Sequence, residues 1–272
     1  MMKWVAQGHE LDKIAKQILW NCKSRDKFYI YGAGNLGKQL LETLRRNGHF
    51  SAFIDNDVSK QINGFCDESV IKFEDYKDMG NHNIIIIAAS EKNTIEIKKE
   101  LDNEGFLANK DYYTYEEFLN QIYPIIAMYC HDELFMSLCQ IVLTERCSLK
   151  CKKCAHACYA TDYQTEDMTL EQVANSANNF FKRVDYIHEF VLIGGEPLLY
   201  KDLSKAIEYI GGKYRRQMGT FSITTNGTIM PDMDIIKACR KYNVLLRISN
   251  YSAQIPRLKE KYKKLTEILE EN

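Results

Sequence analysis

Apolar and polar positions follow two different periods along the first 125 residues. Residues 9–22 carry apolar side chains at helical spacing, and residues 27–31 form an aromatic and β-branched run typical of a buried strand. A glycine-rich turn at residues 32–37 comes next, and a helical pattern, a second strand at 51–54 and a third apolar run at 83–89 follow it. This order of strand, turn, helix and strand predicts a parallel βαβ unit.

The second half of the chain repeats the alternation of strand and helix. A strand is predicted at residues 135–144, and a capping-box pattern from Thr169 to Gln172 begins an amphipathic helix. Polar turns and further helical patterns follow three more predicted strands, at residues 189–193, 221–225 and 244–248. Parallel α/β sheets bind ligands at the carboxyl ends of their strands. We therefore expect the turns after these strands to form a site.

These patterns predict an α/β protein with two domains, residues 1–125 and residues 126–272. The first domain would contain a parallel sheet flanked by helices. The second would be a partial (βα) barrel of about four units.

Length and charge narrow the classes of function. The chain has 272 residues, of which 45% are hydrophobic and 27% are charged, as in a globular protein. A formal net charge of −1 gives no electrostatic reason to expect nucleic acid or an anionic membrane as a partner. The apolar runs are far shorter than the ~20 residues of a membrane-spanning helix. Charge near the N-terminus argues against a signal peptide, so we expect a cytoplasmic protein.

Nine cysteines are present, and three of them form the motif Cys147-x3-Cys151-x2-Cys154. Clustered thiolates in a reducing compartment favour metal or iron–sulfur binding over disulfides. Three thiolates can hold one iron–sulfur cluster while one iron remains without a protein ligand. Interleaved lysines would favour the thiolate form. Two alternatives stay open, a structural zinc site and a closed four-cysteine cluster, and both would use Cys158 as the fourth ligand.

A second motif, Gly194-Gly195-Glu196-Pro197, follows the strand predicted at 189–193. The order of strand, cysteine motif, helix, strand and glycine–acid turn resembles the radical S-adenosylmethionine (SAM) enzymes. The resemblance covers roughly residues 136–252. It extends to the segment from Thr224 to Thr228 and to Ser249, which follow the next two strands.

The resemblance implies a [4Fe-4S] cluster bound by Cys147, Cys151 and Cys154. The amine and carboxylate of SAM would bind the open iron. An electron from the cluster would then yield a 5′-deoxyadenosyl radical that abstracts hydrogen from a small-molecule substrate, so an electron donor is expected as a partner. The residues expected to bind SAM are Gly194, Gly195, Glu196 and Pro197 near its amino group, Asn226, and Ser249 near the ribose.

Two departures from the family pattern bear on the site. Lys153 stands where the family often has an aromatic residue, which puts the adenine side of the site in question. About four βα units fit the second domain, whereas the family barrel usually has about six. We therefore expect a fragment, a naturally short protein or one half of an assembly. The strand at 244–248 would be an exposed edge, so we expect self-association or a partner that covers it.

A glycine turn, Gly32-x-Gly34-x-x-Gly37, lies between strand and helix in the first domain, and Asp55 ends the next strand. This matches the dinucleotide fingerprint, in which turn amides hold phosphate and the acid binds ribose. It also resembles the small Rossmann-like domains attached to sugar-modifying and polysaccharide-pathway proteins. Three readings remain: a nucleotide or sugar nucleotide, NAD(P), or a docking module without a ligand.

The leading hypothesis is a radical SAM enzyme with an N-terminal Rossmann-like parallel sheet domain and a partial radical SAM barrel. The sequence does not reveal its substrate, and the first domain alone suggests a sugar nucleotide or a polysaccharide-pathway metabolite. The rival hypothesis is a non-catalytic binding protein. In that case the cysteines would hold zinc or a closed cluster, and the first domain would recruit a sugar nucleotide.

Overall fold

The computed structural model of the chain describes residues 10–22, 25, 27–80, 83–160 and 166–271. The chain divides into two compact units between Met136 and Ser137. The predicted domain boundary at 125/126 falls inside helix α8 (Tyr123–His131), and the division leaves this helix with the first unit.

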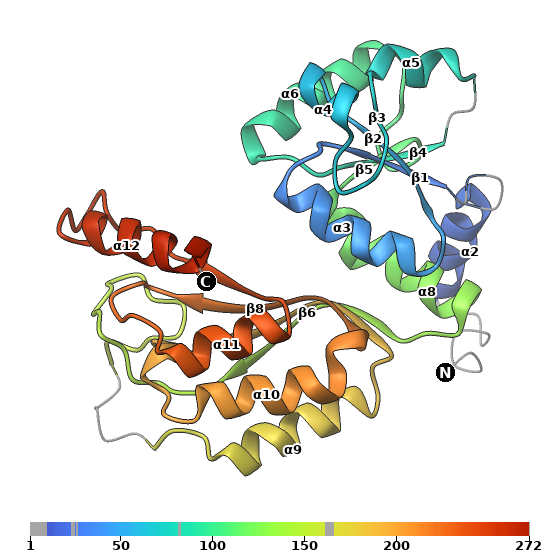
Figure 1. The fold of residues 1–272 in the computed structure, drawn as a ribbon. Coiled ribbons are helices and arrows are strands. Elements are labelled where there is room, and N and C mark those ends of the chain that lie inside the picture. The colour runs from blue at the N-terminus through green and yellow to red at the C-terminus, as the bar shows by residue number, and fades with distance from the viewer. Residues whose placement is uncertain (1–9, 23–24, 26, 81–82, 161–165, 272) are drawn as a thin grey trace. The chain divides into compact units, whose positions relative to one another are not determined.

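The first unit contains a five-stranded parallel sheet with the order β3-β2-β1-β4-β5 (Figure 1). Its strands are β1 (Phe28–Tyr31), β2 (Phe50–Ile54), β3 (Val70–Ile71), β4 (Ile84–Ile87) and β5 (Tyr112–Thr114). Its helices are α2 (Glu10–Cys22), α3 (Asn35–Arg46), α4 (Val58–Asn63), α5 (Phe73–Asp78), α6 (Glu91–Asn103) and α7 (Tyr115–Glu117), and a π-helical turn (Phe118–Ile122) leads into α8. The predicted parallel sheet is confirmed, and its strand order is that of doubly wound folds up to the fifth strand.

Strands β1 and β4 lie at the centre of this sheet because they are apolar on both faces. Every residue of both strands is buried, as expected for a parallel sheet covered by helices on each side. On one face the rings of Phe73, Tyr76 and Phe106 lie against one another. The short apolar runs in the sequence are therefore the interior of the first unit.

The second unit contains a four-stranded sheet with the order β6-β7-β8-β9. The strands are β6 (Phe135–Val142), β7 (Tyr186–Ile193), β8 (Met218–Thr225) and β9 (Val244–Ile248). The helices that follow them in turn are α9 (Leu170–Phe181), α10 (Leu203–Tyr214), α11 (Met233–Lys241) and α12 (Leu258–Glu271), with short 3₁₀ turns at Pro197–Leu199 and Arg215–Gln217. The sheet is parallel, so the expected partial barrel of about four βα units is confirmed.

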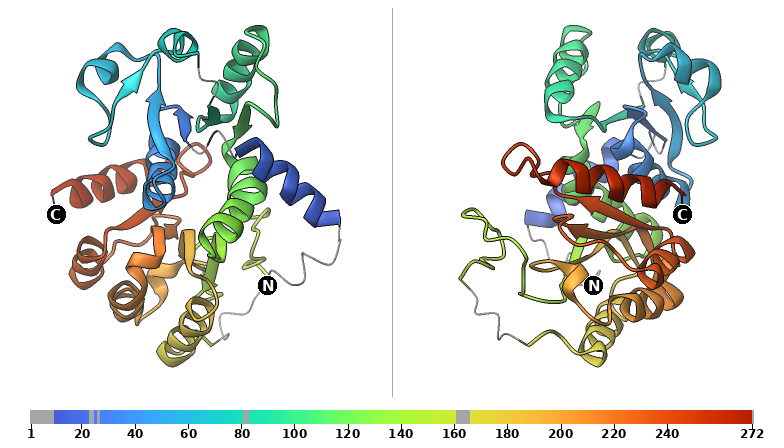
Figure 2. Two further views of the ribbon diagram at one scale, coloured as in Figure 1. Left: turned by 90° about the vertical axis from the view of Figure 1, so that its right-hand side faces the viewer. Right: turned by 60° about the vertical axis from the view of Figure 1, so that its left-hand side comes forward.

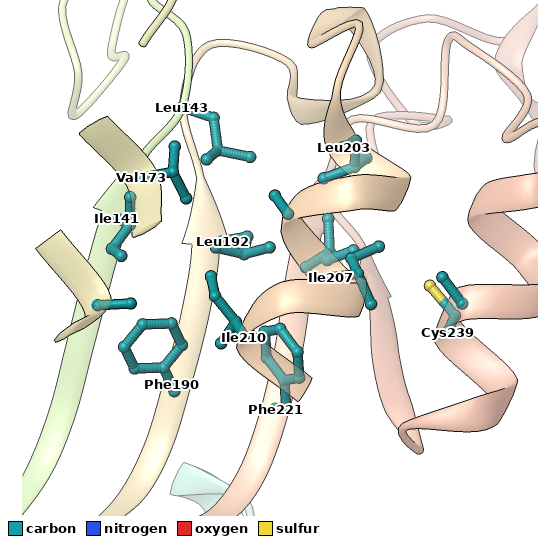
Figure 3. Packing of buried hydrophobic residues seen from close by; sticks show 14 of the residues in the cluster. Ile141, Leu143, Val173, Phe190, Leu192, Leu203, Ile207, Ile210, Phe221 and Cys239 are labelled. Atoms are coloured by element: carbon teal, nitrogen blue, oxygen red, sulfur yellow. The ribbon is translucent and has the colours of Figure 1, made fainter. Parts of the chain in front are cut away.

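The core of the second unit lies between the sheet and helices α9, α10 and α11, which cover one of its faces (Figures 1 and 2). Figure 3 shows Ile141, Phe190 and Phe221 from three neighbouring strands facing Val173 and Ile207 from the helices. Burial of these apolar side chains fixes the sheet, and the carboxyl ends of its strands hold the turns that carry the predicted site. Among the helices that the structure describes, none is long and apolar enough to cross a membrane.

Candidate cofactor site

A cavity of about 400 Å³ lies where the strands of the second unit end. All three motif cysteines line it, together with Gly194, Gly195, Asn226 and Ser249. The remaining lining residues are Leu149, Lys153, Ala155, His156, Ile193, Thr224 and Tyr251. Folding thus brings together residues from four turns that are far apart in the sequence.

Arg146 and Asp167 hold the two ends of the cysteine loop together. The Arg146 Nε–H donates to Asp167 at 2.9 Å, and the Thr144 hydroxyl donates to the same carboxylate at 2.6 Å. Burial works to raise the pKa of Asp167, but these bonds outweigh it and the pKa is lowered. Nearby, the Met168 amide donates to the Leu143 carbonyl at 3.1 Å. Sequence reasoning missed this ion pair, because its partners are separated by the whole loop.

The two glycines of the Gly194–Pro197 turn are required by a close approach of backbone to backbone. A Cβ on Gly194 would lie 2.4 Å from the Thr144 carbonyl oxygen, and one on Gly195 would lie 2.3 Å from that of Arg146. Close by, the Gly195 amide donates to Thr144 and the Glu196 amide to Arg146, both at 2.8 Å. The prediction invoked glycine for close approach to a ligand. In the structure, the approaching group is the segment that leads into the cysteine loop.

Glu196 is fully buried, and its carboxylate joins the turn to strand β8. It accepts hydrogen bonds from the Leu198 amide at 3.0 Å, the Thr225 hydroxyl at 2.7 Å and the Asn226 amide at 2.8 Å. Burial outweighs these bonds and raises the pKa of Glu196. Neither Glu196 nor Pro197 is among the residues that line the cavity. The expected contact between this carboxylate and the amino group of SAM stays a prediction.

Asn226 connects the end of β8 to the first cysteine. Its side-chain amide donates to the Cys147 sulfur at 3.6 Å and to the Ser148 hydroxyl at 3.1 Å. Its side-chain oxygen accepts from the Thr228 amide at 2.9 Å. Asn226 was predicted at the site as a SAM residue, and the structure places it beside the cysteine loop.

The thiols of the loop differ in acidity. Burial raises the pKa of Cys147. At Cys154 burial acts in the same sense, but amide donors, chiefly those of Cys158 and His156, outweigh it and lower the pKa. Burial and a hydrogen bond to Cys154 raise the pKa of Cys158. The thiol of Cys154 is therefore more acidic than the thiol of Cys158.

The donor set fits an iron–sulfur cluster. Cysteine sulfur is its usual ligand, and the three motif cysteines face one cavity. Among the described residues, no three His, Cys, Asp or Glu side chains are gathered as ligands of a single metal ion. A cluster does not require such convergence, because three cysteines would bind three different irons.

A second cavity, of about 730 Å³, lies at the strand ends of the first unit and is lined by Gly32 and Asp55 but not by Gly34 or Gly37. Gly37 instead allows α3 to approach the turn, since its Cβ would lie 2.1 Å from the Gly32 carbonyl oxygen. The Asp55 carboxylate accepts from the Ala33 amide at 2.8 Å. Three glutamates add negative charge to the cavity wall, Glu96, Glu100 and Glu104.

Residues 141–267 match the family model described as Radical SAM superfamily. Residues 141–267 are therefore a radical SAM domain, as the resemblance found in the sequence predicted, and this domain supports an enzyme.

Two curated relatives carry the name GTP 3′,8-cyclase. The one from Erythrobacter litoralis is 31% identical over 93 residues, which are 34% of this chain and 27% of the relative. The one from Marinobacter nauticus is 30% identical over 94 residues, 35% of this chain and 27% of the relative. The match thus spans about a quarter of the length of these relatives. A solved structure of Streptococcus suis SuiB bound to S-adenosylmethionine is 18% identical, with 58% of this chain and 35% of that chain covered and a TM-score of 0.35.

Proposed function

We propose that the second unit binds a [4Fe-4S] cluster through Cys147, Cys151 and Cys154 and binds SAM in the same cavity. The observation that carries the proposal is the shared cavity. It is lined by the three cysteines, by Gly194 and Gly195, and by Asn226 and Ser249. When bound, the cluster would supply the electron that cleaves a carbon–sulfur bond of SAM and so generates a 5′-deoxyadenosyl radical for hydrogen abstraction.

The chain's own residues have separate tasks in this proposal. The Arg146–Asp167 pair holds the loop ends, so the cysteines start from a fixed position. The amide of Asn226 donates to the Cys147 sulfur, and hydrogen bonds to cluster sulfurs tune the reduction potential. Glu196 anchors the turn to β8 and so holds Gly194 and Gly195 beside the cavity.

Anaerobic reconstitution tests the metal assignment. We expect about four irons per chain, and we expect Cys147→Ala, Cys151→Ala or Cys154→Ala to abolish the cluster absorbance. Cys158→Ala should retain it, and Cys239→Ala, a change in the core on α11, controls for loss of a buried thiol. Stoichiometric zinc without iron, in protein made under iron-replete anaerobic conditions, would instead support the non-catalytic rival.

SAM cleavage tests the reaction. The reduced, reconstituted protein should form 5′-deoxyadenosine from SAM, and the three cysteine variants should not. A protein that holds four irons but neither binds nor cleaves SAM would contradict the proposal while leaving the cluster assignment intact.

For the first unit, we propose a nucleotide or sugar nucleotide as the ligand of the cavity beside Gly32 and Asp55. The glutamates on its wall favour the hydroxyl groups of a ribose or sugar, and the phosphate of such a ligand would pair with Lys99 on the same wall. A thermal-shift screen that pairs each nucleoside or free sugar with its phosphorylated form tests this preference. NAD(P) forms the alternative arm of the screen. No shift with any compound would favour a docking module.

Strand β9 has β8 on one side, and no other described strand pairs with its second edge. Leu245 on this strand is 42% exposed. We propose that self-association or a partner protein covers this edge, because unpaired strand edges promote pairing with another chain. An electron donor and a small-molecule substrate complete the proposed set of partners.

A further inference from the structure

Tyr262 on α12 contacts the turns that follow two different strands. Its hydroxyl lies 3.0 Å from the carbonyl oxygen of Asn226, after β8, and 3.1 Å from that of Ser249, after β9. The same oxygen accepts the amide of Tyr251 at 3.2 Å. One phenol group therefore joins the segments that carry the two residues proposed to bind SAM.

The ring of Tyr262 is also built into the turn after β8. Gly227 has a φ of +68°, and a Cβ on it would lie 2.6 Å from the Cε1 of Tyr262. Only glycine lets this turn close onto the ring without displacing it. Tyr262 is only 9% exposed, so water cannot readily replace its hydroxyl at the two carbonyls. The contact is thus both tight and shielded.

Neighbouring contacts strengthen the same connection. The Lys261 ammonium group donates to the Thr228 carbonyl at 3.0 Å. Leu258 and Leu265, on the same helix as Tyr262, are buried. Helix α12 is therefore a support for the two turns, whereas α9, α10 and α11 cover the face of the sheet.

We propose that Tyr262 is a positioning residue that sets the turns after β8 and β9 for SAM binding. The inference rests on the proposed function of the cavity, because it assigns Asn226 and Ser249 to SAM. Tyr262 is not a lining residue of that cavity and acts through the backbone of its neighbours. Its hydroxyl contacts these turns, so its loss should weaken SAM binding while the protein still holds its irons.

The size of the effect follows from population arithmetic. If loss of the hydroxyl leaves the two turns in their binding arrangement one tenth of the time, the apparent dissociation constant for SAM rises tenfold. This rise corresponds to a loss of ~1.4 kcal/mol in the binding free energy of SAM. The phenylalanine ring would still fill the space below Gly227, so the unit should remain folded.

The test compares Tyr262→Phe with Tyr242→Phe, which removes a hydroxyl that donates to Glu208, at 2.7 Å, in an exposed position. In the cofactor-free proteins, amide hydrogen exchange at residues 226–228 and 249–251 should accelerate in Tyr262→Phe and not in Tyr242→Phe. After reconstitution both variants should hold about four irons. The SAM dissociation constant, read from the change that SAM causes in the electron paramagnetic resonance of the reduced cluster, should rise about tenfold only in Tyr262→Phe.

The outcomes of this test separate the positioning role of Tyr262 from the proposed function of the cavity. Unchanged exchange in Tyr262→Phe would overturn the positioning role whatever the cofactor. Faster exchange with unchanged SAM affinity would overturn its link to SAM. A wild-type protein that holds the cluster but shows no response to SAM would refute the proposed function, while the exchange comparison would still decide whether Tyr262 holds the turns. Gly227→Ala, which displaces the ring by another route, should reproduce both effects.

Discussion

Gly195→Ala offers the sharpest test of how the glycine–acid turn is held. The new Cβ would lie 2.3 Å from the Arg146 carbonyl oxygen, 2.6 Å from its carbon and 2.8 Å from the Glu145 carbonyl oxygen. All three are backbone atoms, so the clash cannot be relieved by rotating a side chain. The glycine–acid turn and residues 144–146, the segment that leads into the cysteine loop, must move apart instead.

The expected magnitude combines two effects. Overpacking of a tight site costs roughly 1–3 kcal/mol. Separation of the two segments also weakens two backbone hydrogen bonds, from Gly195 to Thr144 and from Glu196 to Arg146, each worth about 1 kcal/mol. We therefore expect the free energy of unfolding of the second unit to fall by about 2–5 kcal/mol. That is a large share of the roughly 5–15 kcal/mol that stabilises a typical domain.

Urea denaturation can assign this loss to one unit. Both tryptophans of the chain precede residue 21, so tryptophan fluorescence follows the first unit, whereas circular dichroism follows both. Gly195→Ala should shift the circular dichroism transition to lower urea and leave the fluorescence transition in place. The matched control is Gly212→Ala on α10, where the nearest atom is a side-chain atom, the Tyr242 hydroxyl oxygen at 3.3 Å, and no backbone atom is approached. This control should be neutral or stabilising by about 0.5–1 kcal/mol.

The reasoning would be refuted if Gly195→Ala changed the stability of the second unit by less than about 0.5 kcal/mol, the usual range of a surface substitution. Such a result would mean that the turn and residues 144–146 do not lie as close together as the structure shows. The requirement for glycine would then have to come from a ligand.

Three further predictions concern other parts of the chain. Asp167→Asn should lower the unfolding free energy at pH 7 by about 1–3 kcal/mol. The pKa of Asp167 is lowered in the folded state. The difference in unfolding free energy between wild type and variant should therefore be complete above the unfolded pKa of about 4 and should shrink as the pH falls through the folded pKa. Urea titrations at several pH values measure this difference. Gly37→Ala should destabilise the first unit by about 1–3 kcal/mol, whereas Gly34→Ala, with no atom within 4 Å of its Cβ, should not. The urea midpoints of the fluorescence transition compare the two variants. Equal losses of stability would contradict the close packing of Gly37 against the turn. Leu245→Lys should reduce self-association in light scattering at several concentrations if the β9 edge mediates it, and an unchanged mass would exclude that edge.

The strands and the four βα units could be predicted because apolar periodicity is a local property of the chain. The βαβ pattern at residues 27–54 and the turns at Gly194 and Asn226 lie where the sequence placed them. The capping box at Thr169 also begins a helix as predicted, since the Thr169 hydroxyl accepts the Gln172 amide. Each of these features depends on residues a few positions apart.

The direction of a side chain depends on neighbours that are distant in sequence, and there the prediction was incomplete. Glu196 is oriented by Thr225 and Asn226, about thirty residues further on. Tyr262 lies in the helical pattern that follows the last predicted strand, and nothing in such a pattern indicates which carbonyls its hydroxyl will meet. Gly34 and Gly37 are equivalent in the motif, yet only Gly37 is approached closely by other atoms.

The joined ends of the cysteine loop have a consequence for its variability. Arg146 and Asp167 meet, and Met168 bonds back to Leu143, so the chain leaves the sheet and returns to it at nearly one point. The entropic cost of closing such a loop grows only as the logarithm of its length, about 0.6 kcal/mol for each doubling. Insertions, deletions or a grafted loop between these two anchors should therefore disturb the sheet little, so the chemistry presented at the mouth of the barrel can change while the scaffold beneath it stays the same.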